Sequence, residues 1–236
     1  MYRPTLPAHA TGALGLLAAA LLASGCASIQ PARMSLPDGL AARTEQLPVQ
    51  GFGGKRRGDF TVGAASGRFE RNADDLALFE MLDFRRGGAR YTLQAAGAVE
   101  VEAQCKQREI GAQVGILALP LRPYAVNCQW RDGARLSLEA DPRAARTLQG
   151  RQGRFDAAGV QLQVSSVHTL QGSRLPLAHP AGYTLTHQGA VVGAIDLSDS
   201  GKPLLWRPPA GRPLHDAVTN AALALALMWD PAASAP

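Results

Sequence analysis

Alternation of apolar and polar residues is the feature that most constrains how this chain can fold. Residues 91–105 read YTLQAAGAVEVEAQC, in which the odd positions are apolar and the even positions are mostly polar. A period of two places successive side chains on opposite faces of a β-strand, so this stretch is expected to bury one face. Cys105 falls on the inward face. The pattern predicts a β domain.

Turn residues divide the β region into hairpins, and the register of each hairpin follows from which residues must share a face. In residues 126–138 the even positions are apolar on both sides of an Arg-Asp-Gly turn. A three-residue loop keeps Cys128 opposite Leu136 on the inward face, whereas a two-residue loop mixes polar and apolar side chains. We therefore predict a three-residue loop with Gly133 in a left-handed conformation.

The same reasoning predicts two further hairpins. One has a four-residue loop between Phe155 and Val160, and the other turns at Gln188 and Gly189. Residues 72–84 fit either a short helix or a strand. Weaker strands bring the expected number to about twelve, and they lie near residues 60–64, 67–71, 111–119, 145–149 and 203–207.

The chain ends in a segment that is apolar on nearly every side. Residues 213–229 begin with Pro213, which suits the first turn of a helix, and the apolar pattern runs until Asp230 and Pro231 stop it. A helix that is apolar all round must be surrounded by protein or by lipid, and this one is short for a membrane span. We expect it to be buried in the domain; docking into a membrane or a partner protein is the alternative.

These elements predict a mainly β domain over residues 59–231, an antiparallel barrel of about twelve strands with the apolar C-terminal helix 213–229 buried in it. Closing the sheet removes exposed strand edges. A two-sheet β-sandwich with a packed helix is the rival architecture.

The order of motifs over residues 59–230 resembles the tubby carboxy-terminal-like families, which include the LURP-one and phospholipid scramblase families. The likeness is carried by Gly182-Tyr183-x-Leu185, by VGAI at residues 192–195 and by Leu205-Trp206 before the Ala/Leu-rich helix. The resemblance implies a twelve-stranded barrel around a hydrophobic C-terminal helix. It also implies a lipid or envelope partner.

The N-terminus has the layout of a secretory leader. Residues 1–25 contain Arg3, an apolar run of about thirteen residues that is too short for a lasting span, and small residues at the end. Ala23-Ser-Gly-Cys26 resembles the lipobox of bacterial lipoproteins, although that family prefers Leu where Ala23 stands. The resemblance implies a diacylglycerol and an N-acyl chain, such as palmitate, at Cys26. A plain secretory leader that leaves Cys26 as a thiol is the alternative.

The residue after the cysteine bears on the location. Ala27 stands where the lipoprotein family's inner-membrane retention signal would be Asp. The resemblance therefore implies a lipid anchor in the outer membrane, on the periplasmic face, with the lipid bilayer as a partner.

Residues 26–58 are expected to be a lipidated N-terminus and flexible tether, because they are rich in proline and glycine and lack periodicity. The basic run Lys55-Arg56-Arg57 either contacts anionic lipid headgroups or is a solvated part of the tether. The formal net charge of +5 is spread along the chain, which is not the footprint of a nucleic-acid-binding protein.

With Cys26 occupied by lipid, Cys105 and Cys128 remain as an even pair. In an oxidising compartment such a pair is expected to form a disulfide. Neither cysteine belongs to a C-x-x-C motif or has a histidine three or four residues away, so we predict neither a redox site nor a metal site. We also predict no cofactor beyond the covalent lipid.

Two sets of residues can be drawn as catalytic triads, and both lack the G-x-S-x-G context of a nucleophile elbow. Residues 196–201 also resemble the start of a calcium loop, but Arg207 stands where the loop needs Glu. We therefore predict a non-enzymatic binding or envelope-organising role; the alternative is a periplasmic hydrolase using His168 or His187. The two sets are Ser165 or Ser166 with His168 and Asp156, and Ser198 with His187 and Asp196.

Overall fold

The computed structural model describes residues 32–53, 55–78, 82–95, 99–114, 117–145, 147–199, 201–212 and 214–228. The chain divides into two compact units, Met1–Pro31 and Ala32–Pro236, and the fold is that of the second unit. The predicted leader and Cys26 lie outside the described residues.

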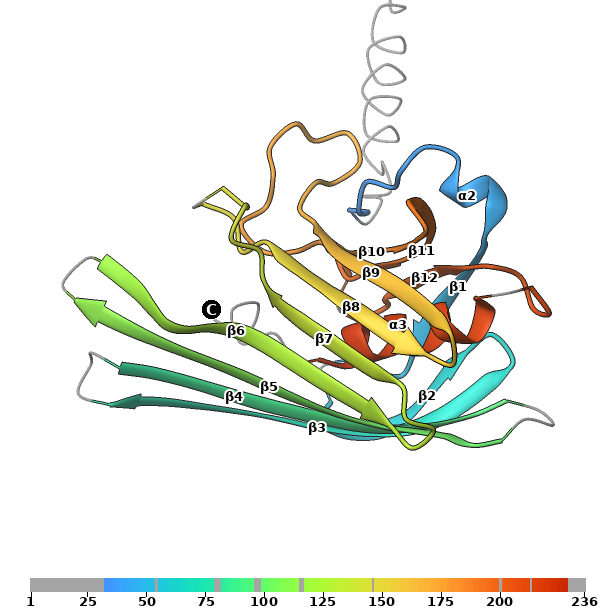
Figure 1. The fold of residues 1–236 in the computed structure, drawn as a ribbon, viewed down its shortest axis with the longest axis horizontal. Coiled ribbons are helices and arrows are strands. Elements are labelled where there is room, and N and C mark those ends of the chain that lie inside the picture. The colour runs from blue at the N-terminus through green and yellow to red at the C-terminus, as the bar shows by residue number, and fades with distance from the viewer. Residues whose placement is uncertain are drawn as a thin grey trace, which may run out of the picture. The chain divides into compact units, whose positions relative to one another are not determined.

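Twelve strands form one closed antiparallel barrel, as predicted (Figure 1). Each strand pairs with its neighbours in the sequence, and β1 pairs with both β2 and β12, which closes the ring and excludes the two-sheet sandwich. The strands are β1 (Glu45–Gln50), β2 (Arg57–Val62), β3 (Ala65–Leu78), β4 (Leu82–Gln94), β5 (Val101–Val114), β6 (Leu117–Trp130), β7 (Arg135–Ala140), β8 (Arg151–Ala157), β9 (Val160–Val167), β10 (Gly182–His187), β11 (Ala190–Asp196) and β12 (Leu204–Arg207).

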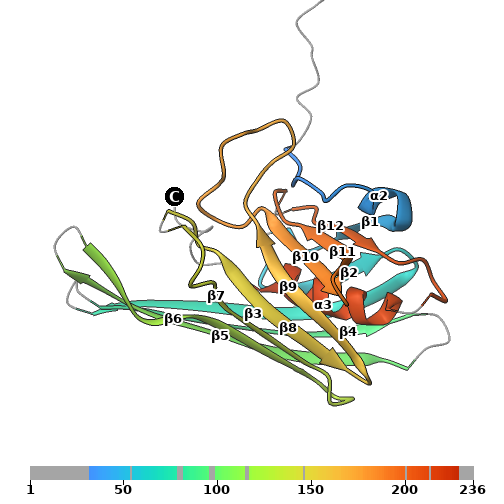
Figure 2. The same cartoon turned by 45° about the horizontal axis from the view of Figure 1, so that its top comes forward.

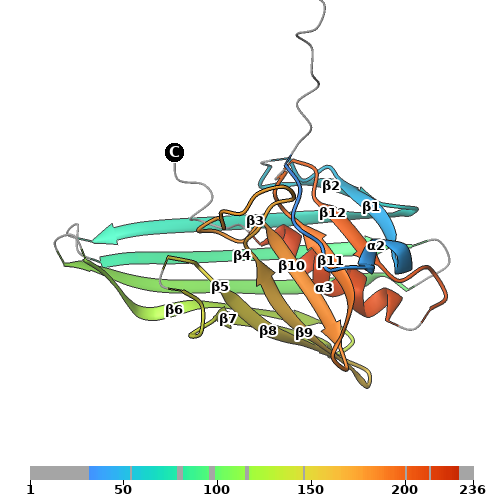
Figure 3. The same cartoon turned by 90° about the horizontal axis from the view of Figure 1, so that it is seen from above.

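The C-terminal helix α3 (His215–Leu227) is buried in this barrel, as predicted (Figure 3). Every residue from Ala217 to Leu227 is buried. Gly193 on β11 allows the close approach, since a Cβ at this position would lie 2.4 Å from Cγ1 of Val218. Within the described residues, no helix combines the length and the apolar character that crossing a membrane requires.

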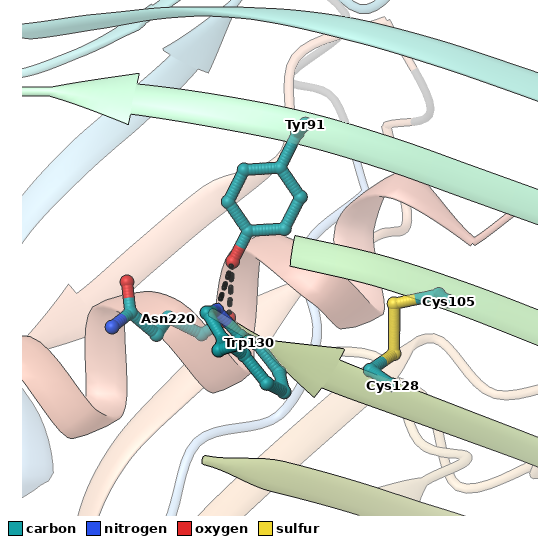
Figure 4. Close-up of a disulfide and its surroundings, with 5 residues drawn as sticks. All are labelled: Tyr91, Cys105, Cys128, Trp130 and Asn220. Atoms are coloured by element: carbon teal, nitrogen blue, oxygen red, sulfur yellow. Dashed lines mark hydrogen bonds between the residues drawn. A yellow bond between two sulfur atoms is a disulfide. The ribbon is translucent and has the colours of Figure 1, made fainter. Parts of the chain in front are cut away.

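Hydrogen bonds fasten α3 to the barrel wall (Figure 4). The Tyr91 hydroxyl on β4 donates to the carbonyl of Asn220 at 3.1 Å and accepts the indole N–H of Trp130 at 3.1 Å. Burial raises the pKa of Tyr91, while the bond from Trp130 acts in the opposite direction. The phenol therefore stays protonated and available as a donor.

The N-terminal segment, residues 32–44, packs against the outer surface of the barrel. Met34 and Leu40, the first residue of helix α2 (Leu40–Arg43), are fully buried against Ala194 and Trp206 of β11 and β12. β10 to β12 are therefore covered by α3 on one face and by this segment on the other. The structure corrects the prediction that residues 26–58 form a flexible tether. The described residues from Ala32 onward belong to the folded domain, and β1 completes the ring.

The two ends of the barrel differ. At the turn end, four connections are short, at residues 63–64, 131–134, 158–159 and 188–189, and the β4–β5 connection at residues 95–100 and the segment from β12 to α3 are longer. At the loop end, four connections are long, at residues 51–56, 141–150, 168–181 and 197–203, whereas those between β3 and β4 and between β5 and β6 have three and two residues. The long strands β3 to β6 project past the loop end on the wall opposite β10 (Figure 2).

The predicted loop of the β6–β7 hairpin is confirmed. The backbone N–H of Trp130 donates to the carbonyl of Ala134 at 3.0 Å, and Cys128 pairs with Leu136. Gly133 has a φ of 90°, so the left-handed conformation is present. The hairpin at residues 188–189 is confirmed as well.

Another local prediction is wrong. Ala157 pairs with Val160, so the β8–β9 loop has two residues rather than four. The two loop residues, Ala158 and Gly159, both have positive φ, which is the geometry of a tight primed turn. Glycine favours a positive φ and alanine does not, so the Ala-Gly sequence indicates this turn only in part. Of the two alternatives for residues 72–84, the strand is confirmed in the described residues 72–78 and 82–84, where Leu76 pairs with Phe84.

The uninterrupted alternation of residues 91–105 conceals a turn. β4 ends at Gln94 and β5 begins at Val101, and the parity of inward positions is the same on both sides of the connection. The strand expected near residues 145–149 is absent from the described residues there; β8 begins only at Arg151. Pro213 and Trp229, the ends of the predicted helix, lie outside the described residues.

Candidate functional site

The predicted disulfide joins two adjacent strands. Cys105 on β5 lies directly opposite Cys128 on β6, with 3.9 Å between their Cα atoms, and both side chains are buried (Figure 4). Cys128 lies two residues before the end of β6, so the bond joins the two strands near the turn that follows β6 rather than in their projecting parts. The pair is a structural cross-link and not a reactive thiol site.

A small cavity remains between α3 and the wall at the loop end. The Arg151 guanidinium is buried there; its Nη1 donates to the Tyr183 hydroxyl at 3.0 Å, and its Cζ lies 3.8 Å from the centre of the Tyr124 ring. The cavity has a volume of about 30 Å³, which is the space of about one water molecule. It is too small for a lipid chain or a sugar. Its lining residues are Tyr124, Leu138, Arg151, Pro180, Tyr183, Leu197, Leu225 and Met228.

One serine–histidine pair meets at the loop end. Ser166 Oγ lies 3.0 Å from Nε2 of His168, and Nδ1 of His168 lies 3.0 Å from the carbonyl of Leu177. Because a carbonyl only accepts, Nδ1 carries the proton and Nε2 accepts from the serine. Ser166 Oγ also accepts the backbone N–H of Arg151 at 2.9 Å. The geometry is that of a serine hydroxyl beside an imidazole nitrogen.

The carboxylate drawn for this triad lies elsewhere. Asp156 is beside the β8–β9 turn at the turn end, where it accepts hydrogen bonds from Arg154 and Gln161 at 2.9 Å each. The structure therefore does not assemble Ser166, His168 and Asp156 into a triad. Ser165 is exposed, on the other face of β9 from Ser166.

The second triad is not assembled either. His187 lies at the turn end, where its Nδ1 is 2.9 Å from the carbonyl of Gln161. Asp196 and Ser198 lie at the loop end, at and beyond the opposite end of β11. The length of that strand separates the histidine from the other two residues.

Asp196 instead fixes the N-terminal segment to the barrel. Its carboxylate is fully buried, and Oδ2 accepts the backbone N–H of Met34 at 3.2 Å with Nη1 of Arg33 at 3.8 Å. Oδ1 accepts from the backbone N–H of Ser198 at 2.8 Å and from its hydroxyl at 2.5 Å. The carboxylate drawn as a calcium ligand is thus held by protein donors. We call these four residues the Asp196 latch.

The β9–β10 connection lies beside the latched segment. The N–H of Ser35 donates to the carbonyl of Thr169 at 2.9 Å, and the N–H of Gln171 donates to the carbonyl of Arg33 at 2.8 Å. At the outer part of this connection, Leu175 and Leu177 are exposed to 79% and 39%. Sequence reasoning missed this feature, although Leu-Pro-Leu in a polar stretch is its signal.

A larger, open groove lies on the outer face of β2, β3 and β4. It has a volume of about 520 Å³ and is lined by charges of both signs. Arg57, Glu70 and Arg90 follow one another across the three strands, so the charges alternate. An alternating surface of this kind selects no single sign of ligand.

Comparisons with known proteins give no match: no family model fits the chain, and no curated protein and no solved structure resembles it closely enough to match. The geometry of the loop end and the N-terminal sequence are therefore the features that bear on function.

Proposed function

We propose that this chain is an outer-membrane lipoprotein, held on the periplasmic face by a diacylglycerol and an N-acyl chain at Cys26, and that its barrel binds at the membrane surface without catalysis. The lipobox-like sequence before Cys26 supports the anchor. Several acyl chains on one residue give firm attachment, because each buried methylene contributes about 0.8 kcal/mol.

The short distance between the anchor and the fold is the observation that carries this proposal. Arg33 and Met34, held by the Asp196 latch, are the seventh and eighth residues after Cys26. An extended chain spans at most about 3.6 Å per residue, so Arg33 lies within roughly 25 Å of the lipidated residue. A domain on so short a connection stays at the bilayer and cannot reach across a compartment.

The filled lumen supports surface binding rather than enclosure of a ligand. α3 occupies the space that a ligand-binding barrel leaves open, and the cavity at its end holds about one water molecule. A partner is therefore expected to meet the outer surface or the loops. The likeness to the tubby-like families, with its lipid or envelope partner, remains part of this proposal.

Cys26→Ala tests the anchor. The intact chain is expressed in a Gram-negative host, and the mass of its N-terminal peptide and its distribution between membrane and soluble fractions are measured. We expect the wild type to carry acyl chains and to stay in the membrane fraction, and the variant to be soluble with its disulfide intact. A wild-type chain with an unmodified Cys26 thiol would contradict the proposal.

A periplasmic hydrolase is the second candidate, favoured by the contact between Ser166 Oγ and His168 Nε2. It ranks lower because Ser166 Oγ is engaged by the Arg151 N–H and because no described carboxylate bonds to His168. Labelling with a fluorophosphonate probe tests it: a covalent adduct that disappears in Ser166→Ala supports the hydrolase, and an unlabelled wild type excludes serine catalysis at this pair.

A further inference from the structure

We infer that the outer part of the β9–β10 connection is a second membrane contact, which enters the phospholipid interface of the same leaflet that holds the Cys26 lipid. We call this part the 174–177 tip; it consists of Arg174, Leu175, Pro176 and Leu177. The inference rests on the proposed function for the anchor and adds to it the orientation of the barrel.

The tip presents apolar side chains to solvent on an ordered base. Its Leu177 N–H donates to the carbonyl of His168 at 2.7 Å, and the Gln149 N–H of the neighbouring connection donates to the carbonyl of Ala178 at 2.8 Å. Residues 171–178 are all exposed. Two leucines held outward by a fixed backbone do not fold back onto the core, so their apolar surface is available to a partner.

The chain path brings the tip close to the membrane. The residues that form the base of the connection are hydrogen-bonded to the segment that leads to Cys26, through Ser35 with Thr169 and Arg33 with Gln171. The anchor and the base are therefore within the same reach of roughly 25 Å.

The charges around the tip also favour a phospholipid surface. In the described connections of the loop end, the fully exposed charged side chains are basic and the carboxylates Asp141 and Asp199 are partly buried, whereas the turn end exposes Glu100 and Asp132 as well as Arg131 and Arg212. Basic side chains near an anionic surface are attracted to it, and arginine can keep its charge at the headgroups while its stem lies among apolar groups. The basic residues of the loop end are Lys55, Arg56, Arg143, Arg174 and Lys202.

A fluorescent probe at the tip tests the contact. Leu175→Cys introduces a free thiol into a chain whose other cysteines are lipidated or in the disulfide. The lipidated protein, labelled with NBD, is reconstituted into vesicles of phosphatidylethanolamine and phosphatidylglycerol, some containing a spin-labelled lipid. Val99→Cys is the matched control, because Val99 is an apolar residue that is 88% exposed at the turn end.

We expect the Leu175→Cys probe to shift to shorter emission wavelength and to be quenched by the spin-labelled lipid, and the Val99→Cys probe to do neither. If both probes emit as in water while the N-terminal peptide is lipidated, the inference is overturned and the proposed function stays intact. Burial of the Leu175→Cys probe in intact cells but not in vesicles also overturns it, because the occupant is then a protein.

A second arm separates the contact from the anchor. Cys26→Ala chains, which lack the lipid, are titrated with the same vesicles, and Leu175→Ser/Leu177→Ser in this background is expected to weaken binding on the order of tenfold. If mass measurement shows that the wild-type Cys26 is unmodified, the proposed function fails. The membrane contact of the 174–177 tip then stands only if the vesicle titration still shows that the two leucines contribute to binding. If it does not, the inference is overturned as well.

Discussion

The two ends of the barrel are built for different tasks. At the turn end, tight hairpins join the strands, and α3 is fixed there: His215 Nδ1 lies 2.8 Å from the carbonyl of Pro208, and Arg207 donates to Thr219 at 3.0 Å. At the loop end, longer connections surround the N-terminal segment, the Asp196 latch and the exposed 174–177 tip.

The longer connections of the loop end are the better candidates for binding residues. Hairpin connections usually have two to five residues, so the connections over residues 141–150 and 168–181 are longer than closing the sheet requires. Long ordered loops on a rigid frame are where binding residues concentrate. The turn end supplies the frame, and the membrane contact that we infer lies at the loop end.

Of the changes considered, removing the disulfide should lower the stability of the barrel most. Cys105→Ala/Cys128→Ala is expected to lower the free energy of unfolding by roughly 3 to 4 kcal/mol, because the closed loop no longer restricts the unfolded chain. Urea unfolding measures the loss. Hydrogen exchange should rise first in the parts of β5 and β6 around the cross-link, near the turn end.

Reductant provides the control for this variant. It should destabilise the wild type by a similar amount and leave the double variant unchanged. Equal exchange along the whole of β5 would show that the cross-link does not act locally near the turn end.

Asp196→Ala should open the loop end without disturbing the turn end. Met34 and Ser198 lose the acceptor for their backbone N–H groups, so we expect a loss of about 3 kcal/mol and rapid exchange of residues 33–36. Asp156→Ala is the matched control, since this carboxylate is half exposed at the turn end and its ion pair with Arg154 should contribute less than about 1 kcal/mol. Similar losses of stability in the two variants would show that the Asp196 latch contributes no more than a surface ion pair.

Tyr91→Phe should loosen the attachment of α3. The indole N–H of Trp130 and the Asn220 carbonyl lose their partner inside the core, and we expect a loss of about 2 kcal/mol by thermal or urea unfolding. If exchange in α3 stays as slow as in the wild type, these bonds do not hold the helix.

The raised pKa of Tyr91 gives this site a pH signature. The neutral phenol is favoured in the folded state, so its contribution is complete below about pH 10 and is lost as the pH rises further, where only the unfolded chain ionises readily. The wild type should therefore lose more stability than Tyr91→Phe between neutral and strongly alkaline pH. Parallel curves for the two proteins would contradict this assignment.

Gly133→Ala should have the smallest effect. A φ of 90° is unfavourable for any residue with a Cβ, and nothing else lies near this position, so we expect a loss of about 1 kcal/mol from backbone strain alone. Urea unfolding measures it. Vesicle binding should not change, because the inferred membrane contact lies at the opposite end of the barrel.

The alternation of apolar residues predicted the strands of the barrel, and the C-terminal segment that is apolar on nearly every side predicted the buried helix. Parity on the two sides of an Arg-Asp-Gly turn determined the β6–β7 register, because a shift by one residue would have turned Cys128 outward. The same parity could not reveal the β4–β5 turn, since inward positions stay odd from Tyr91 to Cys105 across it. Periodicity reports which face is buried and does not report where the chain reverses.

The candidate site was less predictable from the sequence. Pro48 made β1 look like a linker, although its neighbours Leu47 and Val49 alternate with polar residues as in other strands. Asp196 could not be recognised as a latch, because its partner Met34 lies 162 residues away and binds through the backbone. Only the folded chain places the N-terminal segment beside the β9–β10 connection.

Hydrogen exchange of the lipidated chain, in vesicles and in detergent, tests the orientation of the barrel most directly. If the loop end faces the bilayer, residues 168–181 should exchange more slowly in vesicles, while residues 131–134 and 188–189 at the turn end should exchange at the same rate in both. Slower exchange at the turn end in vesicles, or no difference at either end, would contradict an orientation in which the loop end faces the bilayer.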